Sequence, residues 1–256
     1  MRWIDVHCHY EDDRFNEDRE EVLSSLPSFG VLRTIDAGCT TEDSERIKEY
    51  AEKYEHLYFC AGVHPEKADT LTDENLQKLR ALWQHEKCVG VGEIGLDYHW
   101  PENPDKNIQQ ETLRRLLAEA KACGLPAVLH TRDALGDMLT IIREEQVDNA
   151  LMHCFSESRE TARELLDRGL YFSFGGTATF KNARKAVENL QYIPRDRILL
   201  ETDSPYLAPE PVRGTRNDSR NIAHIITFIA ALWGMSPDAV ADLTTENAKR
   251  FFPKMR

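Results

Sequence analysis

Two kinds of hydrophobic pattern alternate along this chain of 256 residues. The first is a short apolar run of the length of a buried β-strand, and the second is a longer segment with apolar residues at helical spacing. The short runs begin near Trp3, Leu32, Leu57, Cys88, Pro126, Ala150, Tyr171 and Ile198. The pattern therefore predicts eight consecutive β/α units.

The helical segments carry recognisable end signals. Over residues 113–120, apolar side chains follow the i, i+3, i+4, i+7 spacing of one helix face, and Gly124 stands where a left-handed C-cap is expected. Polar residues that can accept a hydrogen bond from the first helical turn precede other such segments. On this basis helix N-caps are predicted at Thr72, Asp133, Ser158 and Ser236, the last followed by Pro237 at the first position of a final helix.

Eight β/α units in about 250 residues match the length of a (β/α)₈ TIM barrel. No linker, repeat or low-complexity segment interrupts the pattern, so we expect one α/β domain over residues 1–256. A doubly wound open sheet is the competing topology, but it does not bring residues from the first, fourth, fifth, sixth and eighth strands together as a closed ring does.

Residues that bind divalent metals follow five of the eight apolar runs. In a barrel, active sites lie where the strands end, so these side chains should meet at one mouth. Alternate residues of a strand face the same side, which lets both histidines of His7-Cys8-His9 point inward. The six candidate metal ligands are His7, His9, Glu93, His130, His153 and Asp203.

Each of these residues has a structural explanation of its own. His130 or His153 alone would more often be a hydrogen-bonded strand-end histidine, Glu93 could pair in a salt bridge, and Asp203 could shape a turn before Pro205. The whole set favours metal binding, because buried charges need partners and metal ions supply them.

Four histidines and two carboxylates exceed what one tetrahedral zinc ion needs, so we expect two divalent ions sharing a bridging carboxylate. Glu93 is the natural bridge, because Gly92 and Gly95 permit close backbone approach around it. Asp203 can bind a metal and accept a proton from an attacking water. We expect Glu93 and Asp203 to carry the essential chemistry, while zinc, manganese, iron, nickel and magnesium all remain open.

Other residues near the predicted mouth are candidates for substrate binding. His64 ends the third strand and could bind a phosphate or act as an acid, and Arg132 follows His130 by two residues. The loops after the seventh and eighth strands are frequent phosphate sites in barrels, which favours Arg216. Further basic residues of these loops are Lys181, Arg184, Lys185, Arg213 and Arg220, and possible stacking aromatics are Tyr98, Trp100, Phe155, Phe180 and Tyr206.

Composition narrows the protein class. The formal charge of −12 argues against a broad basic surface for duplex nucleic acid, although a local basic patch beside a metal can still hold a phosphate. No apolar stretch has the length of a signal peptide or membrane span, so a cytoplasmic protein is expected. The six cysteines should be buried reduced thiols, with Cys8 and Cys154 turned away from the histidines beside them by strand alternation.

The ordered combination of several segments resembles the TatD family of metal-dependent hydrolases, within the amidohydrolase-like barrel superfamily. The similar segments are Asp5-Val6-His7-Cys8-His9, Gly62-Val63-His64-Pro65, Gly92-Glu93-Ile94-Gly95-Leu96-Asp97, His130-Thr131-Arg132, His153-Cys154-Phe155-Ser156, Phe180-Lys181-Asn182, Glu201-Thr202-Asp203-Ser204-Pro205-Tyr206-Leu207 and Arg213-Gly214-Thr215-Arg216-Asn217. They span nearly the whole chain.

The resemblance implies a divalent-metal deoxyribonuclease, acting as a 3′→5′ exonuclease on single-stranded DNA or RNA without sequence specificity. In the family's arrangement His7, His9 and Asp203 serve one metal, His130 and His153 serve the other, and Glu93 bridges them. A monomer that binds no membrane is expected.

Two alternatives stay open at this point. The same dinuclear site could hydrolyse a carboxylic ester or amide, as in a D-aminoacyl-tRNA deacylase, because an activated hydroxide also attacks a carbonyl. A metal-dependent nucleic-acid-binding protein in DNA repair or turnover would bind nucleic acid and release no product.

Overall fold

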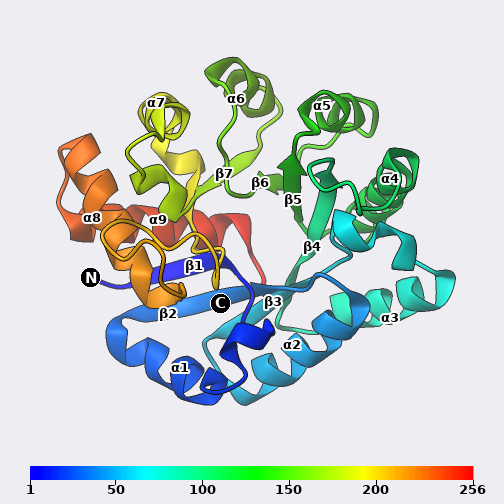
Figure 1. The fold of residues 1–256 in the computed structure, drawn as a ribbon, viewed down its shortest axis with the longest axis horizontal. Helices are drawn as coiled ribbons and strands as arrows, with labels where there is room; N and C mark the ends of the chain where they lie inside the picture. The colour runs from blue at the N-terminus through cyan, green and yellow to red at the C-terminus, as the bar shows by residue number, and fades with distance from the viewer. Residues whose placement is uncertain (256) are drawn as a thin grey trace.

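Eight parallel strands form a barrel in the computed structural model, which describes residues 1–255 (Figure 1). The strands neighbour one another in chain order, and helices surround them. The strands are β1 (Trp3–Cys8), β2 (Val31–Ala37), β3 (Leu57–Ala61), β4 (Cys88–Asp97), β5 (Ala127–Arg132), β6 (Ala150–Met152), β7 (Tyr171–Phe174) and β8 (Ile198–Leu200). The predicted (β/α)₈ TIM barrel is confirmed.

The helices lie outside the strands and follow the predicted alternation. They are α1 (Arg19–Ser25), α2 (Thr41–Lys53), α3 (Asp73–Trp83), α4 (Lys106–Cys123), α5 (Leu135–Glu144), α6 (Arg159–Leu166), α7 (Arg184–Tyr192), α8 (Ile222–Trp233) and α9 (Pro237–Phe251). Short 3₁₀ helices in the loops include η3 (Pro65–Thr70) and η6 (Ser219–Asn221).

Most of the predicted helix ends are confirmed. Thr72, Ser158 and Ser236 accept hydrogen bonds from backbone amides in the first turns of α3, α6 and α9, and Gly124 ends α4 with a φ of 71°. The prediction for Asp133 is wrong. Its φ of 53° places it outside the helix, and the N-cap position of α5 is held by Ala134, which has no capping side chain.

The hydrophobic core has two layers, one on each side of the strands. The outer layer fills the space between strands and helices, with residues such as Leu79, Leu116 and Ile226. The inner layer fills the barrel, where Val6 and Val128 belong to the same cluster as Phe252 at the C-terminal end of α9. Phe252 therefore packs with the inward side chains of the strands. Side chains fill the barrel interior, and the carboxyl ends of the strands are left for the site.

Two register shifts lie next to candidate ligands. The pairing of β1 with β2 shifts between Asp5 and Cys8, the stretch that holds His7. The pairing of β4 with β5 shifts between Val91 and Ile94, the stretch that holds Glu93. A bulge of this kind re-aims the next side chains of a strand, so both shifts help to turn ligands towards the mouth.

The ring is closed between β1 and β8 largely by one side chain. Among the described residues, no continuous ladder of backbone hydrogen bonds pairs β1 with β8. Their backbone pairing is an isolated bridge between Cys8 and Ser204. Below it, the fully buried Asp5 carboxylate accepts hydrogen bonds from the Thr202 amide at 2.9 Å and the Thr202 hydroxyl at 2.6 Å. It also accepts one from the Ser219 hydroxyl at 2.7 Å. Asp5 therefore connects β1, the end of β8 and η6 at the seam.

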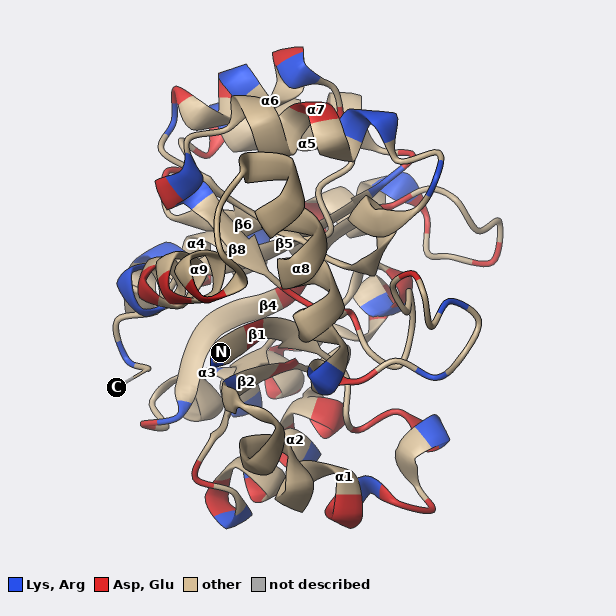
Figure 2. Cartoon of the chain, turned by 90° about the vertical axis from the view of Figure 1, so that its left-hand side faces the viewer, with Lys and Arg blue, Asp and Glu red and all other residues tan. Residues whose placement is uncertain are grey.

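Within residues 1–255, no single helix is long and apolar enough to cross a membrane, although the bent pair Ser219–Trp233 and Pro237–Phe251 meets the length and composition criteria jointly. Acidic and basic residues are interspersed over the outer helices and loops in the view of Figure 2.

We predict that Asp5→Ala lowers the free energy of unfolding by about 3 kcal/mol, because it removes the acceptor of four hydrogen bonds from buried donors. For a chain of this size, such a loss lowers the melting temperature by roughly 6–12 °C. Thermal unfolding followed by circular dichroism measures it. Asp238→Ala is the matched control, because that carboxylate is 72% exposed and pairs only with the N-terminal amine. Equal melting temperatures for the two variants would show that Asp5 does not hold the seam.

Candidate metal centre

The six predicted ligands lie together at the carboxyl ends of the strands. His7 is in β1, Glu93 in β4 and His130 in β5, while His9 and His153 directly follow β1 and β6, and Asp203 is the third residue after β8. Four of the six residues are buried, and the side chains of His130 and Asp203 are only 17% and 18% exposed. Five strands of the ring therefore deliver ligands to one small volume.

Glu93 stands between two pairs of imidazoles. Its Oε2 lies 3.2 Å from His7 Nε2 and 3.5 Å from His9 Nε2. Its Oε1 lies 2.8 Å from both His130 Nδ1 and His153 Nε2. Each carboxylate oxygen thus faces its own histidine pair, which is the arrangement of a bridging ligand.

Asp203 joins one of the two groups. Its Oδ1 lies 3.4 Å from His9 Nε2 and 3.7 Å from His7 Nε2. The backbone fixes this position, because the Asp203 amide donates to the His7 carbonyl oxygen at 2.9 Å and the residue has a φ of 55°. One donor group therefore contains two histidines, Asp203 and one oxygen of Glu93.

The spacing of the donor atoms fits divalent ions. A tetrahedral ion with bonds of about 2.0–2.1 Å holds its ligand atoms about 3.3–3.4 Å apart. His7 Nε2 and His9 Nε2 are 3.1 Å apart, as are His130 Nδ1 and His153 Nε2. His7 Nδ1, which points out of the cluster, has no hydrogen-bond partner within the described residues. Imidazole and carboxylate donors at these distances suit zinc, manganese and related ions.

The charges in the cluster keep its carboxylates ionised. Burial alone would raise the pKa of Glu93, but His153 and His7 beside it hold that pKa well below its usual range. Burial likewise opposes ionisation of Asp203, yet the hydrogen bond from His9 and the charge of His153 lower its pKa to about 2. Ionised carboxylates and deprotonated imidazole nitrogens are the forms that bind metal.

Two acidic residues that were not predicted as site residues orient the histidines. Asp97 Oδ2 lies 3.2 Å from His130 Nε2, on the opposite side of the ring from Glu93. Glu201 Oε1 lies 3.6 Å from His153 Nδ1, while its other oxygen accepts a hydrogen bond from Ser173 at 2.5 Å. Asp97 and Glu201 both belong to segments quoted above for the family resemblance. Their spacing in the sequence, however, did not distinguish them from ordinary loop residues.

Asp97 is itself held in place by Gln109. The Gln109 side chain accepts a hydrogen bond from the Asp97 amide and donates one to the Asp97 carbonyl oxygen, both at 2.9 Å. This clamp joins the end of β4 to α4, so the outer helix supports the orientation of His130.

His64 lies in the site, but as a neutral imidazole. Its Nε2 is 3.6 Å from Glu93 Oε1, and its Nδ1 accepts a hydrogen bond from the Glu66 amide at the start of η3. Burial, and secondarily the neighbouring His130 and His9, lower its pKa to about 3, although Glu93 opposes the shift. His64 can therefore donate a hydrogen bond from Nε2, but it offers a phosphate no full positive charge.

A cavity of about 830 Å³ opens above the cluster. Arg132 lines it as predicted, beside Trp100, whose ring centroid is 5.3 Å from the guanidinium carbon. Arg46 and Lys67 are the other cations in its lining, and they were not predicted. Acidic residues of the lining outside the cluster are Glu11, Asp12, Asp13, Asp43, Glu66 and Asp97.

The prediction that Arg216 binds substrate is corrected. Arg216 does not line the cavity, because its guanidinium donates two hydrogen bonds to Asp18 at 2.6–2.7 Å and a third to the Arg14 carbonyl oxygen. Arg220 is likewise paired with Asp218, and Arg213 lies over Phe180. These three arginines of the loop after β8 thus contact neighbouring residues and do not line the cavity.

The prediction for the cysteines is partly corrected. All six are free, and Cys8 is buried with its thiol directed at the Ile35 carbonyl oxygen, away from the cluster. Cys154, however, lines the cavity, because a φ of 47° breaks the strand alternation on which the prediction relied. Cys39 lines the cavity as well and was not singled out.

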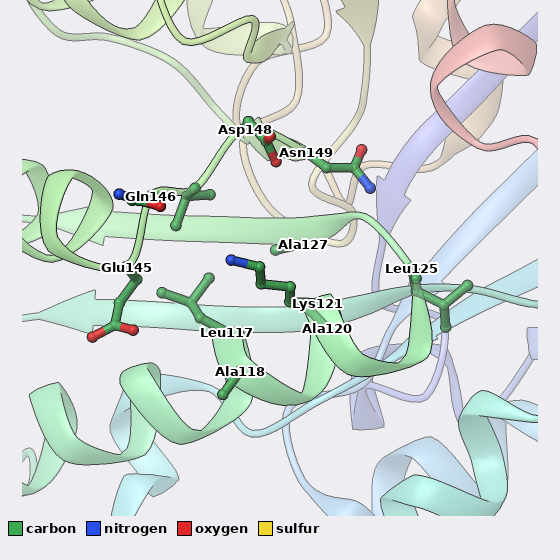
Figure 3. A pocket seen from close by; sticks show the side chains of 12 residues that line it. Leu117, Ala118, Ala120, Lys121, Leu125, Ala127, Glu145, Gln146, Asp148 and Asn149 are labelled. Carbon is green, nitrogen blue, oxygen red and sulfur yellow. The ribbon is translucent and has the colours of Figure 1, made fainter.

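A second cavity, of about 340 Å³, lies between α4 and the loop before β6 (Figure 3). Its charged residues are Lys121, Glu145 and Asp148, and no histidine or cysteine lines it within the described chain. It therefore offers neither metal ligands nor a nucleophile comparable with those of the strand-end cavity.

Comparison with known proteins agrees with this geometry. Residues 4–253 match the family model described as TatD related DNase. An uncharacterized metal-dependent hydrolase, YabD, from Bacillus subtilis is 42% identical over 97% of this chain and 98% of the relative. A protein named 3′-5′ ssDNA/RNA exonuclease TatD, from Cronobacter sakazakii, is 34% identical, with 98% of each chain covered.

Among solved structures, the TatD homologue YjjV from Escherichia coli K12 superposes with a TM-score of 0.91 at 29% identity, covering 98% of each chain. A TatD-family hydrolase from Entamoeba histolytica gives a TM-score of 0.89 at 22% identity and covers 98% of each chain, which shows the shared fold.

We predict that Asp97→Asn weakens metal binding about 10–100-fold, because the carboxylate no longer fixes the His130 ring. Equilibrium dialysis with metal analysis measures this affinity. Asp133→Asn is the matched control, since that exposed carboxylate pairs with His99 on the same rim. Unchanged affinity in Asp97→Asn would exclude the positioning role.

Proposed function

Because the chain belongs to the family of TatD-related DNases, whose members include metal-dependent hydrolases, we propose that it is a 3′→5′ exonuclease that hydrolyses phosphodiesters of single-stranded DNA or RNA. The observation that carries this proposal is the Glu93 carboxylate between two histidine pairs, at the floor of a cavity with exposed aromatic residues and cations in its wall. Single-stranded nucleic acid, bound without sequence specificity, is the proposed partner.

We assign two divalent ions to the two donor groups. His7, His9 and Asp203 would hold one ion, and the pair His130 and His153 would hold the other. When bound, such ions lower the pKa of a water molecule and withdraw charge from phosphoryl oxygens. Glu93 would hold both groups in register through its two oxygens.

Asp203 has the properties of the proton acceptor. It is one of the two less buried members of the cluster, and its side chain lines the cavity. A carboxylate held at the cavity floor by its backbone can take a proton from an attacking water without moving. The neutral His64 would donate a hydrogen bond from the other side of Glu93.

The wall of the cavity suits unpaired bases and a phosphate backbone. Trp100 and Tyr206 are 44% and 41% exposed, and each has an arginine against its ring, Arg132 at 5.3 Å and Arg14 at 4.4 Å. The pairs come from different parts of the ring, after β4 and β5 on one side and after β1 and β8 on the other. Aromatic platforms with adjacent cations bind single strands with little dependence on sequence.

Hydrolysis of a carboxylic ester, including an aminoacyl-tRNA ester, is the competing activity because the same donor groups would serve it. The stacking platforms favour a nucleic-acid substrate over a small ester, but they would serve the unpaired end of an aminoacyl-tRNA as well as an oligonucleotide. Oligonucleotide cleavage and deacylation measured at matched enzyme concentration separate the two reactions.

We predict that Asp203→Asn lowers exonuclease activity at least about 10²-fold on labelled single-stranded oligonucleotides with magnesium or manganese, because the proton acceptor is lost. Asp13→Asn is the matched control, since this exposed carboxylate lines the same cavity but lies outside the cluster. Metal content of both variants shows whether an ion is lost with the carboxylate. Undiminished cleavage by Asp203→Asn would contradict the proposed function.

We predict that Trp100→Ala raises KM for a single-stranded oligonucleotide about tenfold, because one base loses its stacking platform. Hydrolysis of bis(4-nitrophenyl) phosphate, which needs no base stacking, should be unaffected. Ile108→Ala removes another exposed apolar side chain, 41% exposed, from outside the cavity and serves as the control. An equal effect on both substrates would argue against base stacking at Trp100.

A further inference from the structure

A second group of donor atoms meets on the far side of the His9 ring. While His9 Nε2 faces Glu93, its Nδ1 lies 3.8 Å from Cys39 Sγ and 3.6 Å from Glu11 Oε1. Ligand atoms of these three residues all lie within 4.8 Å of one another, and all three residues line the main cavity. None of the steps proposed above uses Cys39 or Glu11.

The distances match a tetrahedral ion with a mixed ligand set. Bonds of about 2.3 Å to sulfur and about 2.0–2.1 Å to nitrogen and oxygen separate sulfur from nitrogen by about 3.6 Å, and nitrogen from oxygen by about 3.3–3.4 Å. The observed 3.8 Å and 3.6 Å need shifts of only a few tenths of an ångström. One thiolate, one imidazole and one carboxylate favour zinc-like, thiophilic ions over magnesium or calcium.

Two buried carboxyl groups with unpartnered oxygens lie at this group. Glu11 is 8% exposed and its Oε2 has no hydrogen-bond partner, while the fully buried Asp36 has an equally unpartnered Oδ2. The other oxygen of Asp36 accepts a hydrogen bond from the Tyr10 amide at 2.9 Å. Within residues 1–255, no lysine or arginine forms an ion pair with Glu11 or Asp36. Buried carboxylates require a proton or a cation as partner.

We propose that Cys39 Sγ, the Glu11 carboxylate and His9 Nδ1 form a third cation site, selective for a thiophilic divalent ion such as zinc. The buried carboxyl group of Asp36 lies beside that of Glu11, and all three ligand residues line the cavity. The site shares His9 with the Glu93 cluster but lies on the other edge of its ring.

Occupation of this site would act on the neighbouring centre. The Cys39 thiol proton passes to solvent, and His9 gives up the 2.8 Å hydrogen bond from Nδ1 to the Ala37 carbonyl oxygen. A neutral imidazole has only one unprotonated nitrogen, so an ion on Nδ1 leaves the proton on Nε2. Nε2 then cannot bind the ion beside Asp203. Excess zinc should therefore inhibit the enzyme through this site.

Cadmium titration of the manganese-loaded protein tests the site directly. The Glu93 cluster contains no thiol, so the ultraviolet thiolate-to-cadmium charge-transfer band reports only cysteine coordination. Because the two ions compete for His9, we expect a band in the parent protein that grows as cadmium displaces manganese from the group of His7, His9 and Asp203, and no band in Cys39→Ser. Glu11→Gln should keep the band but require about tenfold more cadmium or more. Cys154→Ser, which removes the other cysteine of the cavity wall, should keep the band at full strength.

No band in the parent protein, a band that survives Cys39→Ser, or one that is lost in Cys154→Ser would overturn the site. Retained manganese binding by each variant shows that it is folded. In the same proteins, the zinc concentration that half-inhibits hydrolysis of bis(4-nitrophenyl) phosphate should rise about tenfold or more in Cys39→Ser. If zinc inhibits Cys39→Ser and the parent protein at the same concentration, the regulatory role is overturned. The absorbance band needs no turnover, so its outcome is independent of the proposed nuclease activity.

Discussion

The site depends first on closure of the ring between β1 and β8. These strands and the residues that follow them place His7, His9 and Asp203, the three residues that we assign to one ion, yet the strands are joined by little backbone pairing. The Asp5 carboxylate replaces the missing ladder with three strong acceptor contacts. Burial raises the pKa of Asp5 to about 7 against the effect of these hydrogen bonds, so placing a carboxylate there has a cost. In return, Asp5 holds β8 beside β1, so that Asp203 lies next to His7 and His9.

The second constraint is the buried charge of Glu93. A carboxylate that is 2% exposed must be compensated, and here four imidazoles surround it. Those imidazoles are in turn held by groups around them: Asp97 for His130, Glu201 for His153 and the Ala37 carbonyl for His9. Because three of the four rings are fixed from behind, their donor atoms are preorganised at ion-binding distances.

The sequence was sufficient for the barrel because periodicity is a local property. All eight strands begin within one residue of the predicted positions, and the ligands could be placed because strand ends share one face of the barrel. Side-chain partnerships across the fold were not accessible in the same way. Arg216 looked like a phosphate ligand until Asp18, distant in sequence, was seen to neutralise it. Cys154 and Asp133 were misjudged because each adopts a positive φ that no simple pattern marks. Cys39 and Glu11 could not be recognised as possible ligands from the sequence, because only the fold brings both of them to His9 Nδ1.

Bound metal ions would also reconcile an acidic protein with the anionic substrate that we propose. The chain carries a net charge of −12, and most charged residues of the cavity wall are acidic. Two divalent ions would bring four positive charges next to the two carboxylates that bind them, while the carboxylates of Asp97 and Glu201 lie farther back, behind the histidine rings. Screening over ~8–10 Å hides the distant acidic residues from a phosphate at the floor, while a phosphate a few ångströms from the ions is strongly attracted. Affinity for nucleic acid should therefore be concentrated at the reacting phosphodiester, with Arg132 and the exposed aromatic rings guiding the flanking nucleotides.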